Sequence, residues 1–482
     1  MFDMRPVVYV IGQMVTVLGL TMLFPMLIDL AYENGHWTVF MQSSIAVTLT
    51  GALMAIATFK RSRGGLSIQQ TFLLTTSVWL ALPVFGALPF VLGEPEARAV
   101  DAFFEAMSAL TTTGSTVFSG LDHLPEGVLL WRSMMQWFGG IGIIVVAMVF
   151  LPELRIGGMQ IFRSEGFDTM GKILPRAAEI STSISTIYLT LTGVCFMSYL
   201  AMCMSEFDAI NHAFTTVATG GFSTRDASFG AFSGGPEYVA SVFMVLASLP
   251  FVRYVQLIGG AARPVFTDSQ IRSFLWVLLV TIAIITIYRF ANTGEAIEPV
   301  FRTALFNVTS IVTGTGYASV DYQLWGSFAV VLSFFMGLVG GCAGSTCCSV
   351  KIFRFQLLFA SIRAQIAQIH SPHGVFSTRY EGRPVSHDVI SSVMAFFVMF
   401  IVTIGVLAVL LSTTGLDFIT SVSGAATAIA NIGPGLGDVI GPAGNFASLS
   451  DTAKWLLAAG MLIGRLELLV VYTILTVKFW RG

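Results

Sequence analysis

Long apolar stretches alternate with short polar segments along the chain, and this pattern predicts an all-α protein that crosses a membrane many times. A membrane-spanning helix needs about 20 mostly apolar residues. Stretches of that length predict ten spans, at residues 7–31, 37–59, 69–93, 129–152, 183–205, 236–260, 271–291, 324–341, 389–412 and 453–478. The basic, amphipathic residues 351–368 predict instead a helix that lies on the cytoplasmic surface of the membrane.

A second kind of segment recurs four times between pairs of these spans. Aligned without gaps, the copies read DAFFEAMSALTTTG, DAINHAFTTVATGG, TALFNVTSIVTGTG and TSVSGAATAIANIG, and they end at Gly114, Gly221, Gly316 and Gly433. Each copy has Ser or Thr at its eighth position and glycine at its fourteenth. The Asp or Thr at the first position predicts helix N-caps at Asp101, Asp208, Thr303 and Thr420.

These segments are too short and too polar to span a bilayer, so each predicts a re-entrant half-helix followed by an extended loop. Non-helical backbone at membrane depth is tolerated only where it is buried in protein or lines a water-filled cavity. Four such loops therefore predict a shared aqueous axis. All four units run in the same direction, which fits repeats around an axis along the membrane normal. Chance similarity between extracellular turns is the alternative, and the gapless matches disfavour it.

The loop ends predict that backbone groups, rather than side chains, bind a cation. The C-terminus of a helix carries a partial negative charge, which favours a cation beside it. The loop ends TTTG, ATGG, TGTG and ANIG hold few ionisable side chains, so carbonyl oxygens are the main ligands on offer. Converging carbonyl oxygens can replace the hydration shell of a monovalent ion. A divalent-selective pore is disfavoured, because no ring of acidic residues occupies these positions.

Composition and charge agree with a membrane protein. Of the 482 residues, 55% are hydrophobic and 11% are charged, whereas a soluble chain has about 25% charged residues. A nucleic-acid binder would need a basic face and is excluded. The positions of Lys and Arg place both termini in the cytoplasm. Asp and Glu are more frequent in the outer loops, which indicates either topogenic bias or an acidic vestibule that concentrates cations.

The four helix–loop–helix units resemble the Trk/Ktr/HKT superfamily of potassium transporters, and its bacterial TrkH/TrkG branch most of all. The resemblance rests on the loop ends TTTGST, ATGGFST, TGTGYA and ANIGPGLGD and on the segments WRSMMQWFGGIGIIV and GGCAGST. It implies potassium uptake across the bacterial cytoplasmic membrane by a homodimer with one pore per protomer. It also implies a cytoplasmic, nucleotide-binding regulatory subunit of the TrkA type. The chain itself is expected to be no enzyme and to hold no organic cofactor.

The resemblance assigns potassium-binding carbonyl groups to the last three residues of each loop. These residues are Thr112, Thr113, Gly114, Thr219, Gly220, Gly221, Gly314, Thr315, Gly316, Asn431, Ile432 and Gly433. In plant relatives a serine at the first glycine accompanies sodium transport, so Gly114 favours potassium. The expected domains are an N-terminal helix pair and four pore repeats, at residues 1–66, 67–180, 181–265, 266–386 and 387–482.

A glycine-rich run, GLVGGCAGST at residues 337–346, interrupts the eighth predicted span. Close helix packing is one interpretation of these small residues. The resemblance implies another, an intramembrane gating loop. Its flexible core would be Gly340, Gly341, Gly344 and Ser345.

Arg465 lies near the middle of the last predicted span, where an arginine costs about 2.5–3.5 kcal/mol. It is expected either to stabilise the fold by contacting half-helix carbonyl groups or to place a positive charge beside the pore, as the resemblance implies. Glu467 points to another side of the helix. A membrane-embedded enzyme is disfavoured because it would need ionisable residues that converge in the bilayer, and only Arg465 and Glu467 lie near the middle of a predicted span. A sodium- or proton-coupled secondary transporter is the alternative function.

Overall fold

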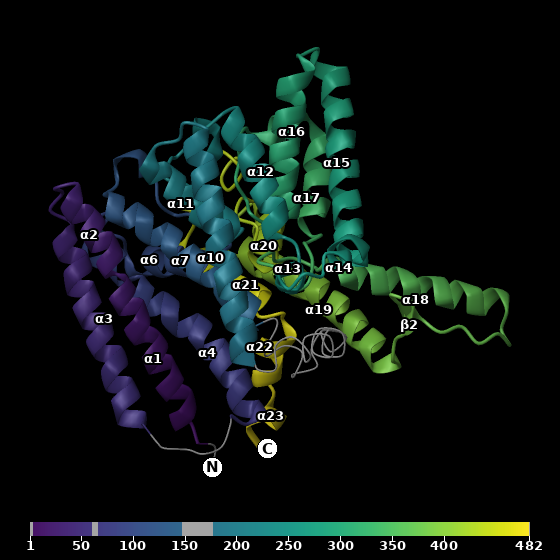
Figure 1. Cartoon of the computed structure of the whole chain (residues 1–482), viewed down its shortest axis with the longest axis horizontal. Helices are drawn as coiled ribbons and strands as arrows, with labels where there is room; N and C mark the ends of the chain where they lie inside the picture. The colour runs from purple at the N-terminus through teal and green to yellow at the C-terminus, as the bar shows by residue number, and fades with distance from the viewer. Residues whose placement is uncertain (1–2, 60–65, 147–176, 482) are drawn as a thin grey trace.

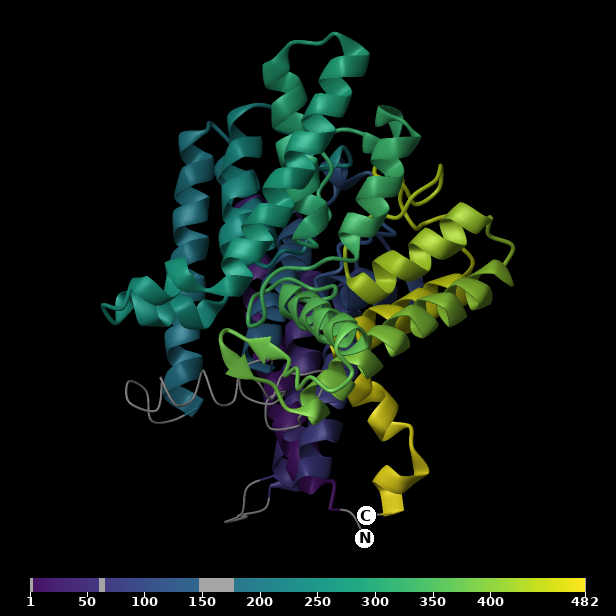
Figure 2. The same cartoon turned by 90° about the vertical axis from the view of Figure 1, so that its right-hand side faces the viewer.

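The computed structural model describes residues 3–59, 66–146 and 177–481, and this part of the chain is mostly helical (Figures 1 and 2). The N- and C-termini lie together at one end of the molecule (Figure 1). The strands among the described residues are β1 (Arg379–Tyr380) and β2 (Arg383–Pro384), which form one short antiparallel hairpin. The predicted all-α class is therefore confirmed.

Seven stretches of helix among the described residues are long and apolar enough to cross a membrane. They are α1 (Arg5–Thr21) with α2 (Leu23–Ala31), α3 (Trp37–Thr58), α4 (Ile68–Gly86) with α5 (Leu88–Leu92), α7 (Glu126–Val145), α10 (Ala177–Ala201), α15 (Ser269–Thr293) and α19 (His387–Ser412). Each coincides with a predicted span, although residues 147–152 of the fourth lie outside the described part.

The predicted span at residues 236–260 is not one straight helix. Its two parts, α12 (Gly235–Ala247) and α13 (Phe251–Ile258), meet at an angle of 88°. Pro250 stands immediately before α13. Proline lacks a backbone N–H and disfavours helical geometry in the preceding residue, so the helix breaks there.

Two further predicted spans, at residues 324–341 and 453–478, are also broken. The first contains η4 (Tyr322–Trp325) and the 11-residue α17 (Ser327–Gly337), after which the glycine-rich run leaves the helix. The second begins as α21 (Asp451–Arg465), turns through Glu467 and Leu468 at positive φ, and resumes as α22 (Leu469–Ile474). Both breaks fall beside the predicted aqueous axis, where irregular backbone at membrane depth can be accommodated.

The four predicted half-helices are present as α6 (Ala99–Leu110), α11 (Glu206–Val217), α16 (Ile297–Val312) and α20 (Phe418–Ala430). Their predicted N-caps are wrong, because each helix begins before the aligned Asp or Thr. In α11 and α20 a stronger cap precedes the aligned residue: Ser205 accepts from the Asp208 amide, and Asp417 accepts from the Thr420 amide. Asp101 and Asp208 instead lie in the first turn, where a carboxylate favours the helix dipole.

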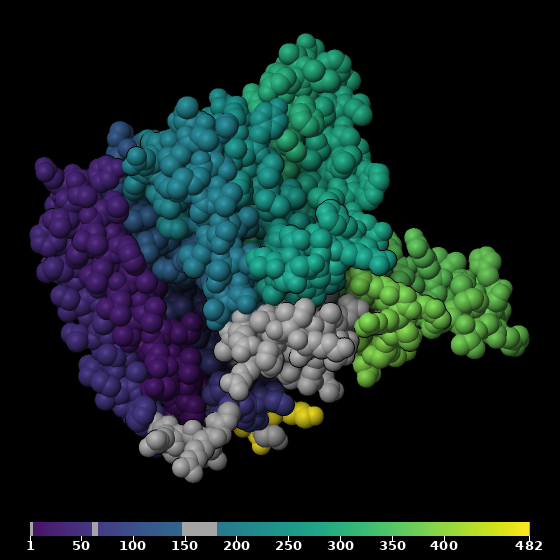
Figure 3. Space-filling model, in the orientation of Figure 1, coloured from purple at the N-terminus to yellow at the C-terminus, as the bar shows by residue number. Residues whose placement is uncertain are grey.

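The amphipathic segment forms α18 (Ile352–His370), as predicted, and projects sideways from the bundle (Figures 1 and 3). It runs across the direction of α15, as a helix on a membrane surface would. The remaining short helices connect or extend the larger ones. They are η1 (Leu121–His123), η3 (Ser228–Ala231), α14 (Arg263–Thr267) and α23 (Val477–Arg481).

The N-terminal helices α1 and α3 pack through glycines, and they form one flank of the molecule (Figure 1). A β-carbon added to Gly51 would lie 2.5 Å from the Thr16 amide nitrogen and 2.8 Å from Gly12 O. One added to Gly12 would lie 2.8 Å from Gly51 O. Small residues let two membrane helices approach closely enough for extensive van der Waals contact.

We therefore expect Gly51→Val to destabilise the protein by about 1–3 kcal/mol, the usual cost of overpacking a close contact. The readout is the melting temperature of the purified protein in detergent. Gly405→Val in α19 is the matched control, because an added β-carbon there meets nothing within 4 Å. Equal losses of stability in the two variants would contradict this packing.

Candidate cation-conducting site

Each half-helix ends in the same backbone conformation, followed by three residues that we call the loop motif. The motifs are Thr112–Gly114, Thr219–Gly221, Gly314–Gly316 and Asn431–Gly433. In every motif the middle residue donates its amide to the carbonyl of the aligned Ser or Thr, at 2.8–3.1 Å. This is the Schellman arrangement, which requires left-handed geometry at the motif's first residue. The first and third residues have φ values of 52° and 86°, 51° and 76°, 72° and 84°, and 52° and 104°.

Positive φ at the first motif position comes with strain. Thr112 and Thr219 are β-branched, and such residues rarely adopt left-handed geometry. A residue held in this region costs about 1–3 kcal/mol and persists only where its surroundings impose it, as at functional sites. The sequence suggested glycine-dependent geometry at the third position of all four motifs. At the first position only Gly314 and Asn431 are residue types that favour left-handed geometry.

The four motifs close into a ring. The glycine of each motif faces the carbonyl group of the middle residue in the next motif, and the fourth returns to the first. A β-carbon added to any of these glycines would lie within 3.0 Å of that oxygen, in the pairs Gly114 and Gly220, Gly221 and Thr315, Gly316 and Ile432, and Gly433 and Thr113. The structure thus brings all four predicted loops together around one axis, and only glycine allows this separation.

Most carbonyl oxygens of the motifs have no partner among the described residues. Gly220 O accepts a hydrogen bond from Gln136 Nε2 at 2.6 Å, and Gly433 O accepts one from Ser115 Oγ at 2.8 Å. Within the described part of the chain, the other motif carbonyls accept none. Buried backbone carbonyls without partners are rare, and they mark the place of water or an ion. The donor set suits a weakly hydrated monovalent cation.

All four motif glycines line one cavity of about 190 Å³ on the outer side of the ring. Its wall also includes Arg132, Arg225 and Asp226. The wall near the ring therefore mixes both signs of charge. An excess of acidic residues in the outer loops does not make this part of the vestibule purely acidic.

Two amide side chains that the sequence analysis did not single out for their side-chain chemistry hold the motifs in place. Gln136 of α7 accepts from the Phe222 amide at 3.1 Å while it donates to Gly220 O, so it holds the backbone on both sides of Gly221. Asn431 donates through Nδ2 to Thr113 Oγ1 at 2.9 Å and to Met461 O at 3.0 Å. The fourth motif thus departs from the others because its side chain ties it to the first motif.

The glycine-rich run, residues 337–346, lies beside the ring together with the residues that follow it. The chain is non-helical from Val339 to Ser349 and buried from Gly340 to Cys348. Thr112 Oγ1 is 4.0 Å from Cys348 Sγ, and the Ser349 amide donates to Ala430 O at 3.1 Å. The run is also anchored to α12, where the Cys342 amide donates to Ser248 O at 3.1 Å. The residues that follow the run therefore contact the ends of two half-helices at once.

Arg465 is buried below the ring and has several partners. It donates through Nη2 to Gly139 O at 2.8 Å and through Nη1 to Cys348 Sγ at 2.6 Å. Its guanidinium carbon lies 5.3 Å from the centre of the Trp79 ring. Glu467 pairs with Arg354 instead. Arg465 also donates through Nη1 to Thr346 O at 3.5 Å, so it joins α7 to the glycine-rich run. The two carbonyls it contacts belong to a spanning helix and to the run, and neither belongs to a half-helix.

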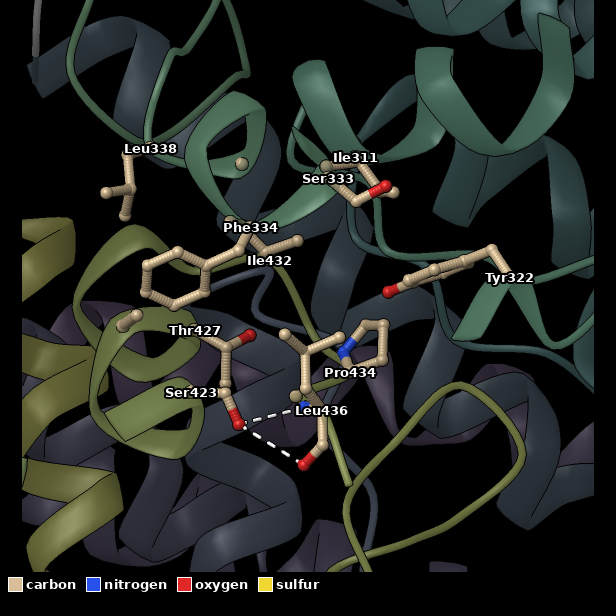
Figure 4. A pocket seen from close by; sticks show the side chains of 13 residues that line it. Ile311, Tyr322, Ser333, Phe334, Leu338, Ser423, Thr427, Ile432, Pro434 and Leu436 are labelled. Atoms are coloured by element: carbon tan, nitrogen blue, oxygen red, sulfur yellow. Dashed lines mark hydrogen bonds between the residues drawn. The ribbon is translucent and has the colours of Figure 1, made fainter. Parts of the chain in front are cut away.

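A smaller cavity of about 40 Å³ lies behind the fourth motif, between α17 and α20 (Figure 4). Phe334, Leu338 and Ile432 make its wall largely apolar. Figure 4 also shows Ser423 hydrogen-bonded to the backbone of Leu436, in the extended segment that follows the motif.

A ring of backbone carbonyls formed by four re-entrant loops within a bundle of apolar helices defines a multi-pass membrane protein of the cation-transport class. The chain belongs to the TrkH family, described as cation transport proteins, whose model matches residues 36–480. The predicted family is thereby confirmed, and it is a family of transporters rather than of enzymes.

Several proteins of this family are similar over their whole length. The chain is 43% identical to the Trk system potassium uptake protein TrkI of Halomonas elongata, across 99% of this chain and 97% of that protein. It is 35% identical to the Trk system potassium uptake protein TrkH of Salmonella typhimurium, across 99% of both. The crystal structure of the potassium transporter TrkH from Vibrio parahaemolyticus superposes with a TM-score of 0.92 at 32% identity, covering 100% of both chains.

The crowding inside the ring can be tested without any transport measurement. Gly316→Ala combines positive φ with a collision against Ile432 O. Gly120→Ala has positive φ with nothing within 4 Å. We expect about 1–2 kcal/mol of lost stability in Gly120→Ala from backbone geometry alone. Gly316→Ala should lose about 1–3 kcal/mol more. Melting temperatures in detergent give the comparison, and equal losses would contradict the ring.

Proposed function

We propose that this protein takes up potassium ions across the bacterial cytoplasmic membrane along the axis of the four loop motifs. The observation that carries this proposal is the closed ring of carbonyl oxygens, most of which accept no hydrogen bond from the described residues. Such oxygens can replace the hydration shell of an alkali ion. The membrane potential supplies about 2.3 kcal/mol per charge for each 100 mV. The names of the relatives as potassium uptake proteins support the identity of the ion.

In this proposal the potassium ligands are main-chain oxygens of the twelve motif residues named above, which we now call the filter. The filter contains no carboxylate, so its attraction for cations comes from carbonyl dipoles and from the ends of four half-helices. That modest field suits a single charge. Gln136 and Asn431 support selectivity because they restrain the motifs from contracting around a smaller ion.

We also propose that residues 337–346 gate the pore, with Gly340, Gly341, Gly344 and Ser345 as the flexible part. Two observations support this assignment: the run is irregular and buried beside the filter, and it continues into Cys348, which Arg465 contacts. Arg465 places a fixed positive charge next to that path. Displacing the run would break the contact, so the arginine would act on both the barrier and the gate.

The assembly is proposed by the same reasoning. The relatives' names describe parts of a Trk system, which supports a membrane component that works with other chains. We propose a homodimer with a cytoplasmic, nucleotide-binding partner of the TrkA type. Both termini would be cytoplasmic, in keeping with their shared end of the molecule (Figure 1). The division into an N-terminal pair, residues 1–66, and four repeats belongs to this proposal.

The first test is growth of a bacterium deficient in potassium uptake on low potassium. The wild-type chain should restore growth, together with the regulatory subunit if it is required.

In proteoliposomes, Gly114→Ser should lower the potassium-over-sodium flux ratio by about ten-fold, because its side chain would collide with Gly220 O. Gly120→Ser is the matched control. Flux that requires an imposed proton or sodium gradient would favour the secondary transporter instead.

The second test concerns the buried arginine. Arg465→Ala removes a positive charge beside the pore, so we expect potassium flux in vesicles to rise by about ten-fold, the equivalent of about 1.4 kcal/mol in the barrier. Arg465→Lys keeps the charge and should stay near the wild type. Unchanged flux in a folded Arg465→Ala protein would assign this residue a structural role only.

A further inference from the structure

A buried polar contact recurs behind the filter in every repeat. It joins the middle of the half-helix to the extended segment that leaves the filter, at a residue two or three positions beyond the motif glycine. We call this extended segment, which is not a β-strand, the outer strand of its motif. In the alignment of the four repeats, the fifth position holds Glu105, His212, Asn307 and Gly424. The three side chains at this position are all buried.

The first three repeats make this contact from the fifth position. Glu105 accepts from Thr116 Oγ1 and from the Val117 amide, both at 2.9 Å. His212 Nε2 lies 3.0 Å from Ser223 Oγ. The contacts use a carboxylate in one repeat and an imidazole in the next, so the geometry recurs while the chemistry changes.

The third repeat uses an amide, since Asn307 donates to Ser319 Oγ at 3.0 Å and accepts from the Ser319 amide at 3.2 Å. The fourth has Gly424 at the fifth position and makes the contact from the preceding residue. Ser423 Oγ accepts from the Leu436 amide at 2.9 Å (Figure 4). The contact is therefore retained even where the aligned side chain is missing.

Only the first of these four contacts is ionic. Arg132 of α7 donates through Nε to Glu105 Oε1 at 2.8 Å, and both side chains are at most 1% exposed. The same guanidinium donates to Ser223 O at 3.0 Å, on the strand that leaves the second motif. It also lies 4.2 Å from the Phe222 ring centre. Glu105 and Arg132 thus connect the outer strands of the first and second motifs, next to the close approach of Gly114 and Gly220.

A buried ion pair contributes little net stability, because desolvation offsets its attraction. The ion pair instead fixes the positions of its partners, since charge-assisted hydrogen bonds are short and directional. Here that geometry sets the position of two strands whose carbonyl oxygens line the axis. A filter discriminates between potassium and sodium through the number and placement of its carbonyl oxygens. Loosening the outer strands would let the ring contract around the smaller ion.

We propose that Glu105 and Arg132 are positioning residues that determine the cation selectivity of the filter, and that Asn307 and Ser423 serve the third and fourth motifs in the same way. This inference rests on the proposed potassium uptake. None of these side chains touches the ion, because each acts through the backbone that leaves the filter.

The test measures potassium and sodium flux into proteoliposomes that contain the purified full-length protein. Glu105→Gln keeps the shape and an acceptor oxygen but removes the charge, and it should lower the potassium-over-sodium ratio by about ten-fold. Ser423→Ala removes one neutral contact with little change in volume, and a drop of about three-fold is expected. This second variant keeps the test decisive if Glu105→Gln does not fold.

Glu237→Gln is the matched control. Glu237 is buried and paired with Arg302, like Glu105 with Arg132, but it joins α12 to α16 and touches no filter strand. The melting temperature of the Glu237→Gln variant should fall, while its potassium-over-sodium flux ratio should stay within about two-fold of the wild type.

Wild-type ratios in both folded Glu105→Gln and Ser423→Ala would overturn the inference. So would a Glu237→Gln ratio that drops as far as that of Glu105→Gln, since the effect would then reflect general destabilisation. A wild-type protein without any preference for potassium would instead overturn the proposed function, and this result is visible before any variant is compared.

Discussion

The structure depends on holding the carbonyl oxygens of four separate chain segments close together inside a membrane protein. Each oxygen carries a partial negative charge, the charges repel one another, and most of these oxygens accept no hydrogen bond from the residues that the structure describes. The arrangement persists because each half-helix ends in a Schellman turn and because glycine alone fits the contacts between motifs.

The surroundings of the ring differ from repeat to repeat, although the backbone is nearly the same in all four. Gln136 supports the second motif, while the side chain of Asn431 ties the fourth motif to the first. This variety is tolerated because the axis is lined by backbone rather than by side chains. A side chain behind the ring is constrained only by the hydrogen bond that it has to make.

Two buried arginines lie on opposite sides of the ring, and neither is left without acceptors. Arg132, on the outer side, pairs with Glu105 and connects two outer strands. Arg465, on the inner side, donates to Gly139 O and to Cys348 Sγ. Burial of a guanidinium is costly unless its donors are satisfied, so each arginine fixes the groups around it. The outer one constrains the filter, and the inner one constrains the glycine-rich run.

The fold class, the re-entrant half-helices and the four motif glycines could all be predicted from the amino-acid sequence, because apolar length and positive φ are local requirements of the chain. The sequence misplaced the helix starts, since Ser205 and Asp417 outcompete the aligned residues as caps. The partners of Arg132 and Arg465 could not be predicted in this way, because they are set by how distant segments pack. Those contacts join residues 27 to 326 positions apart, and no local pattern specifies which distant group will satisfy a buried charge.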